Sequence, residues 1–330
     1  MKFLKEQKIL LVRFSSLGDV LLTTPLIRSL KKLNNNFEID FIIKEQFKDV
    51  VSNNPYIRKV FAIKNFNELK RIKNKLIENK YDIVINLQNN FRSRKFVKGI
   101  SPKIFGYKKE NINKFLLVNF KINRLQNIIP TPVRYANSIP GFRLDNEGLE
   151  LFIPENIKPT ITEKPDTIGF CPGSVHKTKM WPEEYFIKLG NMFSEKGYRI
   201  ILFGGKSDRQ ICSRISGKIF SAIDASNDNK LFETSVNMKL CKTVICNDSG
   251  LMHTAVANKV PVVALFGSTV KEFGFAPYKS KSLVIENSLL RCRPCTHIGL
   301  NECPKKHFDC MKTLTPEFVF NKTLNFLKTI

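Results

Sequence analysis

The chain has 330 residues, of which 42% are hydrophobic, and it carries a formal net charge of +25. This length favours two domains over one, and no apolar run reaches the length of a transmembrane helix. The charge indicates an anionic partner, which is nucleic acid, an anionic membrane leaflet or an anionic small substrate. The first residues lack a secretory cleavage pattern, so we expect a cytoplasmic protein.

The first half of the chain alternates between apolar strands and helices. Residues 9–12 are a predicted strand, 13–19 a loop, and 20–33 a helix that Pro25 either delays or bends. Further strands are expected at 37–43, 60–63, 81–87 and 103–107, with helices at 46–51, 66–79 and 91–98. This series predicts a parallel sheet with helices on both faces. Residues 108–150 are less regular, and the prolines at 154, 159 and 165 mark a linker.

A second series of the same kind follows the linker. Strands are expected at 167–170, 199–203, 219–224, 244–246 and 260–266, and helices at 182–195, 208–217, 229–241 and 251–257. Residues 315–330 read as an amphipathic terminal helix. The fold class is therefore α/β, with an N-terminal domain over 1–160, a C-terminal domain over 161–315, and a last helix over 316–330.

The loop at 13–19 joins the first strand to its helix and therefore lies at the ligand-binding edge of the first sheet. It matches neither a GxGxxG fingerprint nor a Walker loop, so neither a dinucleotide-binding enzyme nor a P-loop nucleotidase is indicated. Asp19 is explained equally well as a helix cap and as a carboxylate offered to a substrate hydroxyl.

The loop at 171–182 holds the side chains most suited to phosphate in the second domain. Ser174 and Thr178 offer hydroxyl groups, and Lys179 offers an ammonium group. The alternative is an ordinary polar surface loop. The single tryptophan, Trp181, lies beside Lys179, and such a large ring is seldom placed in a loop without a role.

The turn after residues 244–246 is a second predicted anion site. Asp248 or Ser249 is placed to cap the next helix, and Gly250 lets the backbone approach a ligand closely. His253 lies on the same side of that helix, whose free N–H groups and dipole favour a phosphate. A capped helix with a buried histidine explains the same residues.

Four of the eight cysteines are clustered near the C-terminus, with the spacing C-x2-C-x7-C-x6-C. In a reducing compartment this cluster of Cys292, Cys295, Cys303 and Cys310 is more typical of a four-ligand structural zinc site than of a disulfide pair. Reduced thiols and disulfides remain open.

Three segments together resemble the motifs of glycosyltransferase family 9, the heptosyltransferases that act on lipopolysaccharide. They are RFSSLGDVLLTTP from Arg13, CPGSVHKTKMWPEEYF from Cys171, and CNDSGLMHTAVANKVPVVALFGST from Cys246. The resemblance covers nearly the whole chain. It implies a GT-B fold, in which two Rossmann-like domains face a central cleft and the last helix often packs back on the N-terminal domain.

The resemblance also implies an inverting, metal-independent transfer of a heptose or related sugar from a nucleotide-sugar, ADP-heptose by family, to a lipid-linked glycan acceptor. Asp19 stands at the family's position for the general base. Donor-binding residues would be Ser174, Thr178, Lys179, Asp208, Asp248, Ser249, Gly250 and His253. In this scheme Asp248 and Asp208 meet sugar or ribose hydroxyls, while Lys179 and the N–H groups at Ser249 and Gly250 stabilise the leaving diphosphate.

Acceptor-binding residues would be Ser16, Gly18, Gln88, Arg92 and Arg94. Arg92 and Arg94 lie on the basic helix and suit acceptor phosphates or carboxylates, or simply face solvent. A lipid-linked acceptor and the basic helix predict peripheral contact with an anionic membrane, at the inner face of the inner membrane. The alternatives are another GT-B enzyme, such as a nucleotide-sugar epimerase, and a nucleic-acid-binding protein. The sequence contains no recognised nucleic-acid motif, so we expect no such partner.

Overall fold

The computed structural model describes residues 7–330. Residues 1–6, where the predicted absence of a signal peptide begins, lie outside the described residues. The chain forms two compact units. Unit 1 holds the described residues up to Glu110 and Pro130–Phe152, and unit 2 holds Asn111–Ile129 and Ile153–Ile330. The inserted segment Asn111–Ile129 lies within the predicted N-terminal domain, yet it belongs to unit 2 because its Leu117 and Leu125 pack with Val270 and Phe273.

Unit 1 is built on a five-stranded sheet in the order β3-β2-β1-β4-β5, and all of its pairs are parallel. The strands are β1 (Lys8–Val12), β2 (Glu38–Lys44), β3 (Lys59–Ile63), β4 (Ile83–Asn86) and β5 (Lys103–Gly106). The central strands are apolar and buried, as expected for a sheet covered on both faces.

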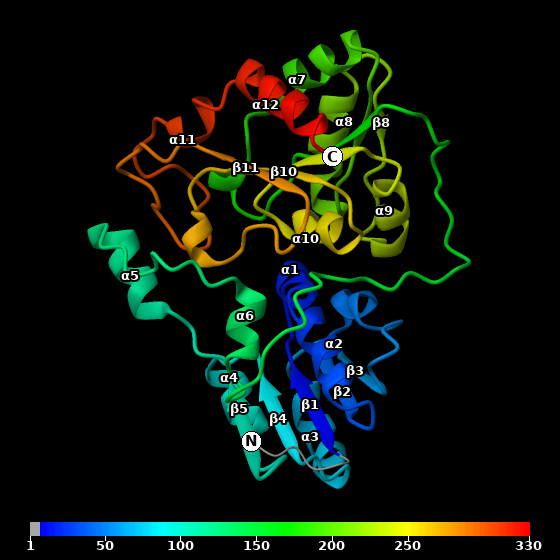
Figure 1. The fold of residues 1–330 in the computed structure, drawn as a ribbon, viewed down its shortest axis with the longest axis vertical. Coiled ribbons are helices and arrows are strands. Elements are labelled where there is room, and N and C mark those ends of the chain that lie inside the picture. Colours follow the sequence, from blue (N-terminus) through cyan, green and yellow to red (C-terminus); the bar gives the residue numbers. More distant parts are fainter. Residues whose placement is uncertain (1–6) are drawn as a thin grey trace. The chain divides into compact units, whose positions relative to one another are not determined.

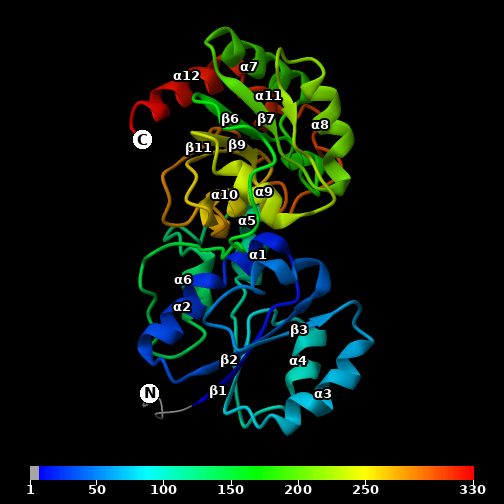
Figure 2. The ribbon, with the colours of Figure 1, turned by 90° about the vertical axis from the view of Figure 1, so that its right-hand side faces the viewer.

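The helices of unit 1 cover both faces of this sheet. Figure 2 shows α2 and α6 on one side, and α3 and α4 on the other. They are α1 (Leu17–Leu21), α2 (Thr24–Leu33), the 3-10 helix η1 (Glu45–Val50), α3 (Glu68–Glu78), α4 (Phe91–Val97) and α6 (Thr131–Ala136). The sequence left open whether Pro25 delays or bends the helix expected at 20–33. In the structure Pro25 stands in the first turn of α2, and α1 is a separate helix before it.

Unit 2 contains a six-stranded parallel sheet in the order β11-β10-β9-β6-β7-β8. The strands are β6 (Thr167–Cys171), β7 (Arg199–Leu202), β8 (Ile223–Asp224), β9 (Thr243–Asn247), β10 (Val262–Phe266) and β11 (Ser282–Glu286). Figure 1 shows α7 and α12 above β10 and β11, and α9 and α10 below them. Helix α8 packs on α7, and α9 packs on α10. The fold class predicted from the sequence is confirmed in each unit.

The helices of unit 2 include α5, η2, η4 and α11, which the sequence did not predict. In chain order the helices are α5 (Asn111–Phe120), η2 (Lys177–Lys179), α7 (Glu183–Glu195), η3 (Lys206–Asp208), α8 (Arg209–Ser216), α9 (Leu231–Met238), α10 (Gly250–Ala257), η4 (Lys271–Phe273), α11 (Asp309–Lys312) and α12 (Pro316–Leu327). The terminal helix α12, for which the resemblance allowed packing on the N-terminal domain, lies in unit 2 and packs on α7 through Phe193 and Phe320 (Figure 2).

Trp181 is a core residue of unit 2. Its ring is 1% exposed, packs edge-on against Phe186, and donates from Nε1 to the carbonyl oxygen of Leu314 at 2.8 Å. The tryptophan that the sequence analysis connected with function therefore fixes the loop after β6 to the domain core.

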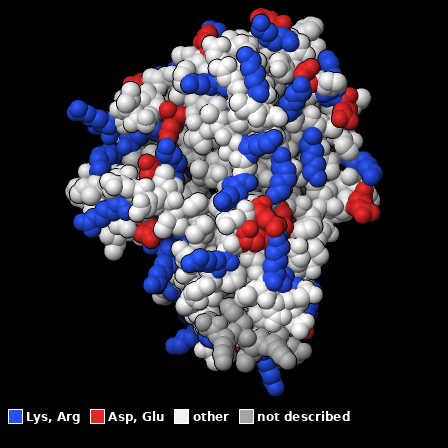
Figure 3. All heavy atoms as spheres, viewed as in Figure 1, with Lys and Arg blue, Asp and Glu red and all other residues white. Residues whose placement is uncertain are grey.

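Basic side chains are spread over the surface shown in Figure 3, with acidic ones between them. This agrees with a charge that runs along the whole chain rather than in one tail. Among residues 7–330, no helix is both long enough and apolar enough to span a bilayer.

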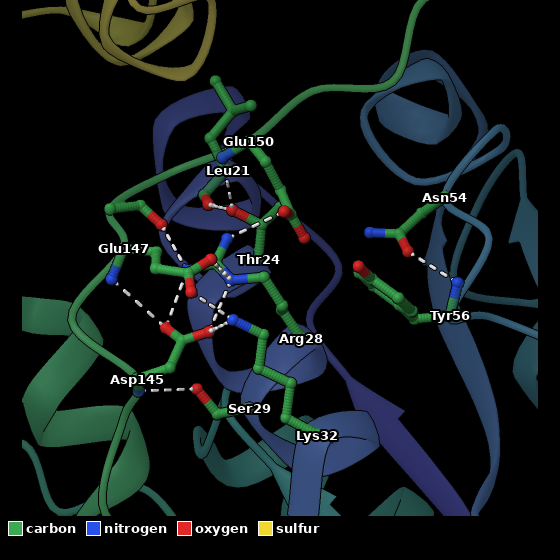
Figure 4. Close-up of polar contacts among 11 residues, drawn as sticks. Leu21, Thr24, Arg28, Ser29, Lys32, Asn54, Tyr56, Asp145, Glu147 and Glu150 are labelled. Atoms are coloured by element: carbon green, nitrogen blue, oxygen red, sulfur yellow. Dashed lines mark hydrogen bonds and ion pairs between the residues drawn. The ribbon is translucent and has the colours of Figure 1, made fainter. Parts of the chain in front are cut away.

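A buried arginine fixes the loop before the linker to α2 (Figure 4). Arg28 is 4% exposed and binds Asp145 through two nitrogens, at 2.7 and 2.9 Å. It also donates to Glu150 at 2.8 Å and to the carbonyl oxygen of Gly148 at 2.8 Å. Four charge-assisted hydrogen bonds thus hold α2, the helix that follows α1, in place.

Candidate active site

Each sheet has one topological switch point, where the strand order reverses. In unit 1 it lies between β1 and β4, and in unit 2 between β6 and β9. Open α/β sheets bind ligands at this point, beyond the carboxyl ends of the strands. The polar loops that the sequence singled out follow β1, β6 and β9, so each unit carries its predicted site residues where its own topology favours a ligand.

The unit 1 site is centred on Asp19 in the first turn of α1. Its Oδ2 accepts from the Ser16 backbone N–H at 3.1 Å and from the Ser16 hydroxyl at 2.8 Å. Its Oδ1 lies 2.7 Å from Nη2 of Arg13. Asp19 therefore performs the capping role that the sequence left open, and its side chain remains 21% exposed.

Arg13 fixes this carboxylate in position. The Arg13 side chain is buried, and it donates from Nε to Ser15 O at 2.9 Å and from Nη1 to Leu87 O at 2.7 Å. Burial alone would raise the pKa of Asp19, but the Arg13 charge and the Ser16 hydrogen bonds outweigh it and lower that pKa. Asp19 is therefore ionised at neutral pH and able to accept a hydrogen bond from a substrate hydroxyl.

Aromatic and basic groups surround the Arg13–Asp19 pair. The Arg13 guanidinium carbon lies 5.7 Å from the ring centre of Tyr135, and Tyr107 meets that ring edge-on at 4.9 Å. Burial lowers the pKa of Lys109, and the charge of Arg13 lowers it further. Arg13 is paired with Asp19, so Lys109 adds a basic group to this part of unit 1 beyond the pair itself, which suits an anionic substrate.

The other predicted acceptor residues fall into two groups. Gly18 is buried in α1, and Gln88 accepts from the Phe14 N–H at 3.1 Å, so both lie after the strands that border the switch point. Arg92 and Arg94 lie on α4, where Arg92 stacks 4.1 Å from the ring centre of Phe66 and Arg94 is exposed. The guanidinium of Arg92 is thus partly engaged within unit 1.

The unit 2 site joins the loops after β6 and β9. Lys179 Nζ lies 2.7 Å from Oδ2 of Asp248, a buried carboxylate that also accepts from the Thr269 hydroxyl at 2.7 Å. Asn247 connects the same loops, because its amide donates to Pro172 O at 2.8 Å and accepts from the Trp181 N–H at 3.0 Å. Asp248 holds the ammonium group of Lys179, and its predicted contact with sugar or ribose hydroxyls stays a prediction.

Helix α10 begins directly after Asp248. Ser249 is its N-cap, Gly250 is its first residue, and His253 is buried in its first turn. The Ser249 hydroxyl is buried, and within the described part of the chain it has no hydrogen-bond partner. An ammonium group beside the N-terminus of an eight-residue helix is suited to binding a phosphate.

The remaining donor predictions differ in what the side chains contact. Thr178 was expected to bind phosphate, but its buried hydroxyl donates to Leu300 O at 3.1 Å and accepts from the Leu300 N–H at 2.8 Å. It therefore ties two loops together. Asp208 accepts from the Gly205 N–H at 3.1 Å, and its carboxylate lies so close to Gly173 that a Cβ there would be 2.3 Å away. Ser174 is half-buried in the same loop.

The four clustered cysteines are free thiols. Cys310 lies in the core of unit 2, and burial raises its pKa to about 12. Burial and the neighbouring Cys303 and Cys292 raise the pKa of Cys295. Within residues 7–330, no group of three or more His, Cys, Asp or Glu side chains has an arrangement that could hold a metal ion. The zinc prediction therefore rests on the spacing of the cysteines alone.

Sequence reasoning missed three residues that organise these sites, namely Arg13, Asn247 and Thr269. Each stands next to or at the end of a motif that had been recognised, and each acts by holding a predicted residue or loop. Their positions could have indicated this role, because polar residues directly after buried strands are expected to fix the loop that follows. Lys109 offered no comparable signal, since only the fold brings it near Asp19.

The chain is similar to known proteins over most of its length. Residues 69–306 match the model of glycosyltransferase family 9 (heptosyltransferase). Lipooligosaccharide heptosyltransferase 2 of Haemophilus ducreyi is 28% identical over 312 residues, which cover 84% of this chain and 88% of that protein. A family 9 glycosyltransferase structure from Veillonella parvula has a TM-score of 0.81 at 24% identity, covering 100% of this chain and 99% of that one.

A second solved structure has the same fold. ADP-heptose lipopolysaccharide heptosyltransferase II of E. coli superposes with a TM-score of 0.73 at 22% identity, covering 98% of this chain and 99% of that one. These likenesses support the GT-B fold class. Together with the family match, they favour the transferase over the epimerase and the nucleic-acid-binding alternatives.

Proposed function

Because the chain belongs to glycosyltransferase family 9, we propose that it transfers a heptose from ADP-heptose to the core of a lipopolysaccharide or lipooligosaccharide. The names of two relatives mention lipooligosaccharide as the acceptor and ADP-heptose as the donor, respectively. The observation that carries the proposal in this chain is the pair of switch-point sites. One unit presents an ionised carboxylate, and the other presents an ammonium group beside a helix N-terminus.

In the proposed reaction, Asp19 accepts the proton of the acceptor hydroxyl as its oxygen attacks the anomeric carbon. The bond from that carbon to the diphosphate breaks on the opposite side, so the configuration inverts. A carboxylate with a lowered pKa is a weak base in the free enzyme. Asp19 contributes to the reaction because it is ionised and correctly oriented. Arg13 and Ser16 supply that orientation through three contacts.

The leaving diphosphate gains charge as the bond breaks, and we place it between Lys179 and the first turn of α10. The Asp248 contact uses one of the three Lys179 N–H donors, which leaves two for phosphate oxygens. The N–H groups at Ser249 and Gly250, with the helix dipole behind them, supply further stabilisation. With these donors the proposed reaction needs no divalent metal.

We place the acceptor at the cationic surroundings of Asp19, where Arg13, Lys109 and Arg94 favour an anionic glycan. A lipid-linked acceptor would bring the enzyme to the cytoplasmic face of an anionic membrane as a peripheral protein. The net charge of +25 and the basic helix α4 fit that location.

Donor identity is tested by nucleotide-dependent thermal stability. ADP should raise the melting temperature of the purified chain more than GDP or UDP at equal concentration, because a ligand stabilises the folded state by mass action. An equal or larger shift with UDP or GDP would contradict ADP-heptose as the donor.

A further inference from the structure

Helix α5 presents large apolar side chains to solvent. Ile112 is 76% exposed, Phe115 is 58% exposed and Phe120 is 62% exposed, and Ile122 just beyond the helix is also exposed. The rings of Phe115 and Phe120 meet edge-on, 6.0 Å apart, so the patch has a continuous aromatic centre. Isolated exposed apolar residues need no explanation, but a contiguous group of this kind marks an interaction surface.

The opposite side of α5 is already covered within unit 2. Leu117 packs with Val270 and Phe273, while the ammonium group of buried Lys114 lies 5.9 Å from the ring centre of Phe273. The helix is therefore apolar on two faces, and only one of them contacts the protein. Apolar side chains on the second face are stabilised when another apolar environment removes them from water.

Basic groups border the open face, and acidic groups are missing from its sequence. Residues 111–129 and 287–301 contain no Asp or Glu. Lys121, at the end of α5, donates to Cys292 O at 3.1 Å and to Pro294 O at 2.7 Å, which holds the cysteine-rich loop beside the helix. Arg124, three residues after Lys121, and Arg291, next to Cys292, are both exposed.

We propose that this face, the α5 surface formed by Ile112, Phe115, Phe120 and Ile122 with Arg124 and Arg291, binds an anionic lipid bilayer. Aromatic and aliphatic side chains enter the boundary between headgroups and acyl chains, while the surrounding cations meet anionic headgroups. On the side where α5 lies in Figure 1, Figure 3 shows basic side chains with acidic ones among them. The absence of acids from both segments favours a lipid surface over a second copy of the chain.

The inference deepens the proposed function, because a lipid-linked acceptor lies in such a surface. It also differs from the basic helix that the sequence suggested, since α4 belongs to unit 1 and α5 to unit 2. Vesicle binding requires no substrate, so failure of the lipid proposal and failure of the transferase proposal can be told apart.

The test is co-sedimentation of the full chain with vesicles of phosphatidylcholine alone and of phosphatidylcholine with phosphatidylglycerol. The chain should bind the anionic vesicles, and the binding should weaken as salt rises. Phe115→Ser with Phe120→Ser should raise the lipid concentration for half-binding by at least about tenfold. Arg124→Glu with Arg291→Glu should have an effect of similar size.

Matched controls use exposed residues of unit 2 outside this surface. Phe220 is 80% exposed, so Phe220→Ser with Lys218→Glu should leave vesicle binding unchanged. Binding by the Phe115→Ser/Phe120→Ser variant equal to that of the unaltered chain would overturn the proposal, as would equal binding to neutral vesicles. A dimer in sedimentation velocity that this variant abolishes, with vesicle binding unchanged, would assign the α5 surface to self-association instead.

Discussion

Replacing Lys179 by alanine tests the proposed diphosphate site, provided that its effect on stability is separated from its effect on binding. Lys179 is the partner of Asp248, whose side chain is only 9% exposed. The Lys179→Ala substitution removes a phosphate donor, and it also leaves a buried carboxylate without its counter-charge. That carboxylate would then face the phosphates directly.

The two effects differ in size and in the measurement that reports them. Removing one partner of a buried ion pair costs roughly 3–5 kcal/mol of folding stability. The loss of a hydrogen bond to a charged group costs about 1.5–3 kcal/mol of ADP affinity, which corresponds to roughly 10- to 150-fold in the dissociation constant. Repulsion from the unpaired Asp248 adds to the loss of affinity.

A second substitution, Asp248→Asn, separates these contributions. The double variant Lys179→Ala/Asp248→Asn should recover part of the lost stability, since no buried charge remains unpaired. It should still bind ADP more weakly than the unaltered chain, because the ammonium group is missing. Urea unfolding measures the first quantity, and calorimetric titration measures the second.

Adenosine and ADP distinguish phosphate binding from a general effect. All Lys179 variants should bind adenosine with nearly unaltered affinity, because a bare nucleoside carries no phosphate. Lys177→Ala, at an exposed lysine of the same turn, is the matched control and should leave ADP affinity within about twofold. An equal loss of affinity for adenosine and ADP would refute the placement of the diphosphate beside Lys179.

Further substitutions and conditions test the rest of the account. Asp19→Asn should lower turnover by roughly a hundred- to ten-thousand-fold while leaving ADP affinity unchanged, and near-normal turnover would reduce Asp19 to a helix cap. Because the pKa of Asp19 is lowered, the fall of kcat/KM in acid should occur below the usual carboxyl pKa range. Arg13→Leu should shift this fall to higher pH, and an unshifted profile would contradict the role of the Arg13–Asp19 ion pair. Arg28→Ala should cost roughly 3–5 kcal/mol of unfolding free energy, which urea unfolding would detect. Burial would raise the pKa of Asp145, but Arg28 and Lys32 outweigh it and lower that pKa. The stability gained from Asp145 is therefore complete above the ordinary aspartate pKa and falls as the pH drops toward the folded-state value, so the urea midpoints of Asp145→Asn and the unaltered chain should converge in acid. EDTA should leave transfer intact, and a loss that added Mg²⁺ restores would indicate a catalytic metal.

The sequence predicted the sheets well because hydrophobic runs and strand–loop–helix alternation are local signals. The strands around Ile9, Val244 and Val262 were each located to within about two residues, and their parallel pairing followed from the crossover helices. The helix α5 was missed because its sequence carries no such local signal. Its polar and apolar residues are mixed around the helix without a clean amphipathic period, so only contacts with Phe273 in another part of the chain define its place.

Site residues could be predicted as far as the motif positions, but their partners required the fold. Nothing in the order of residues indicates that Asp248 would accept from both Lys179 and Thr269. Thr178 shows the converse, because the sequence predicts a phosphate ligand at this hydroxyl, next to Lys179, whereas the fold brings Leu300 against it. Distant contacts decide which polar groups remain available to a substrate.

The most direct test of the central claim is a transfer assay with the purified chain, ADP-heptose and a heptose-deficient lipopolysaccharide core. Mass spectrometry should show an acceptor that is heavier by one heptose residue, and a coupled assay should show an equal amount of released ADP. ADP release with free heptose and no acceptor product, or the absence of both products in the presence of a folded, ADP-binding chain, would contradict the assignment as a heptosyltransferase.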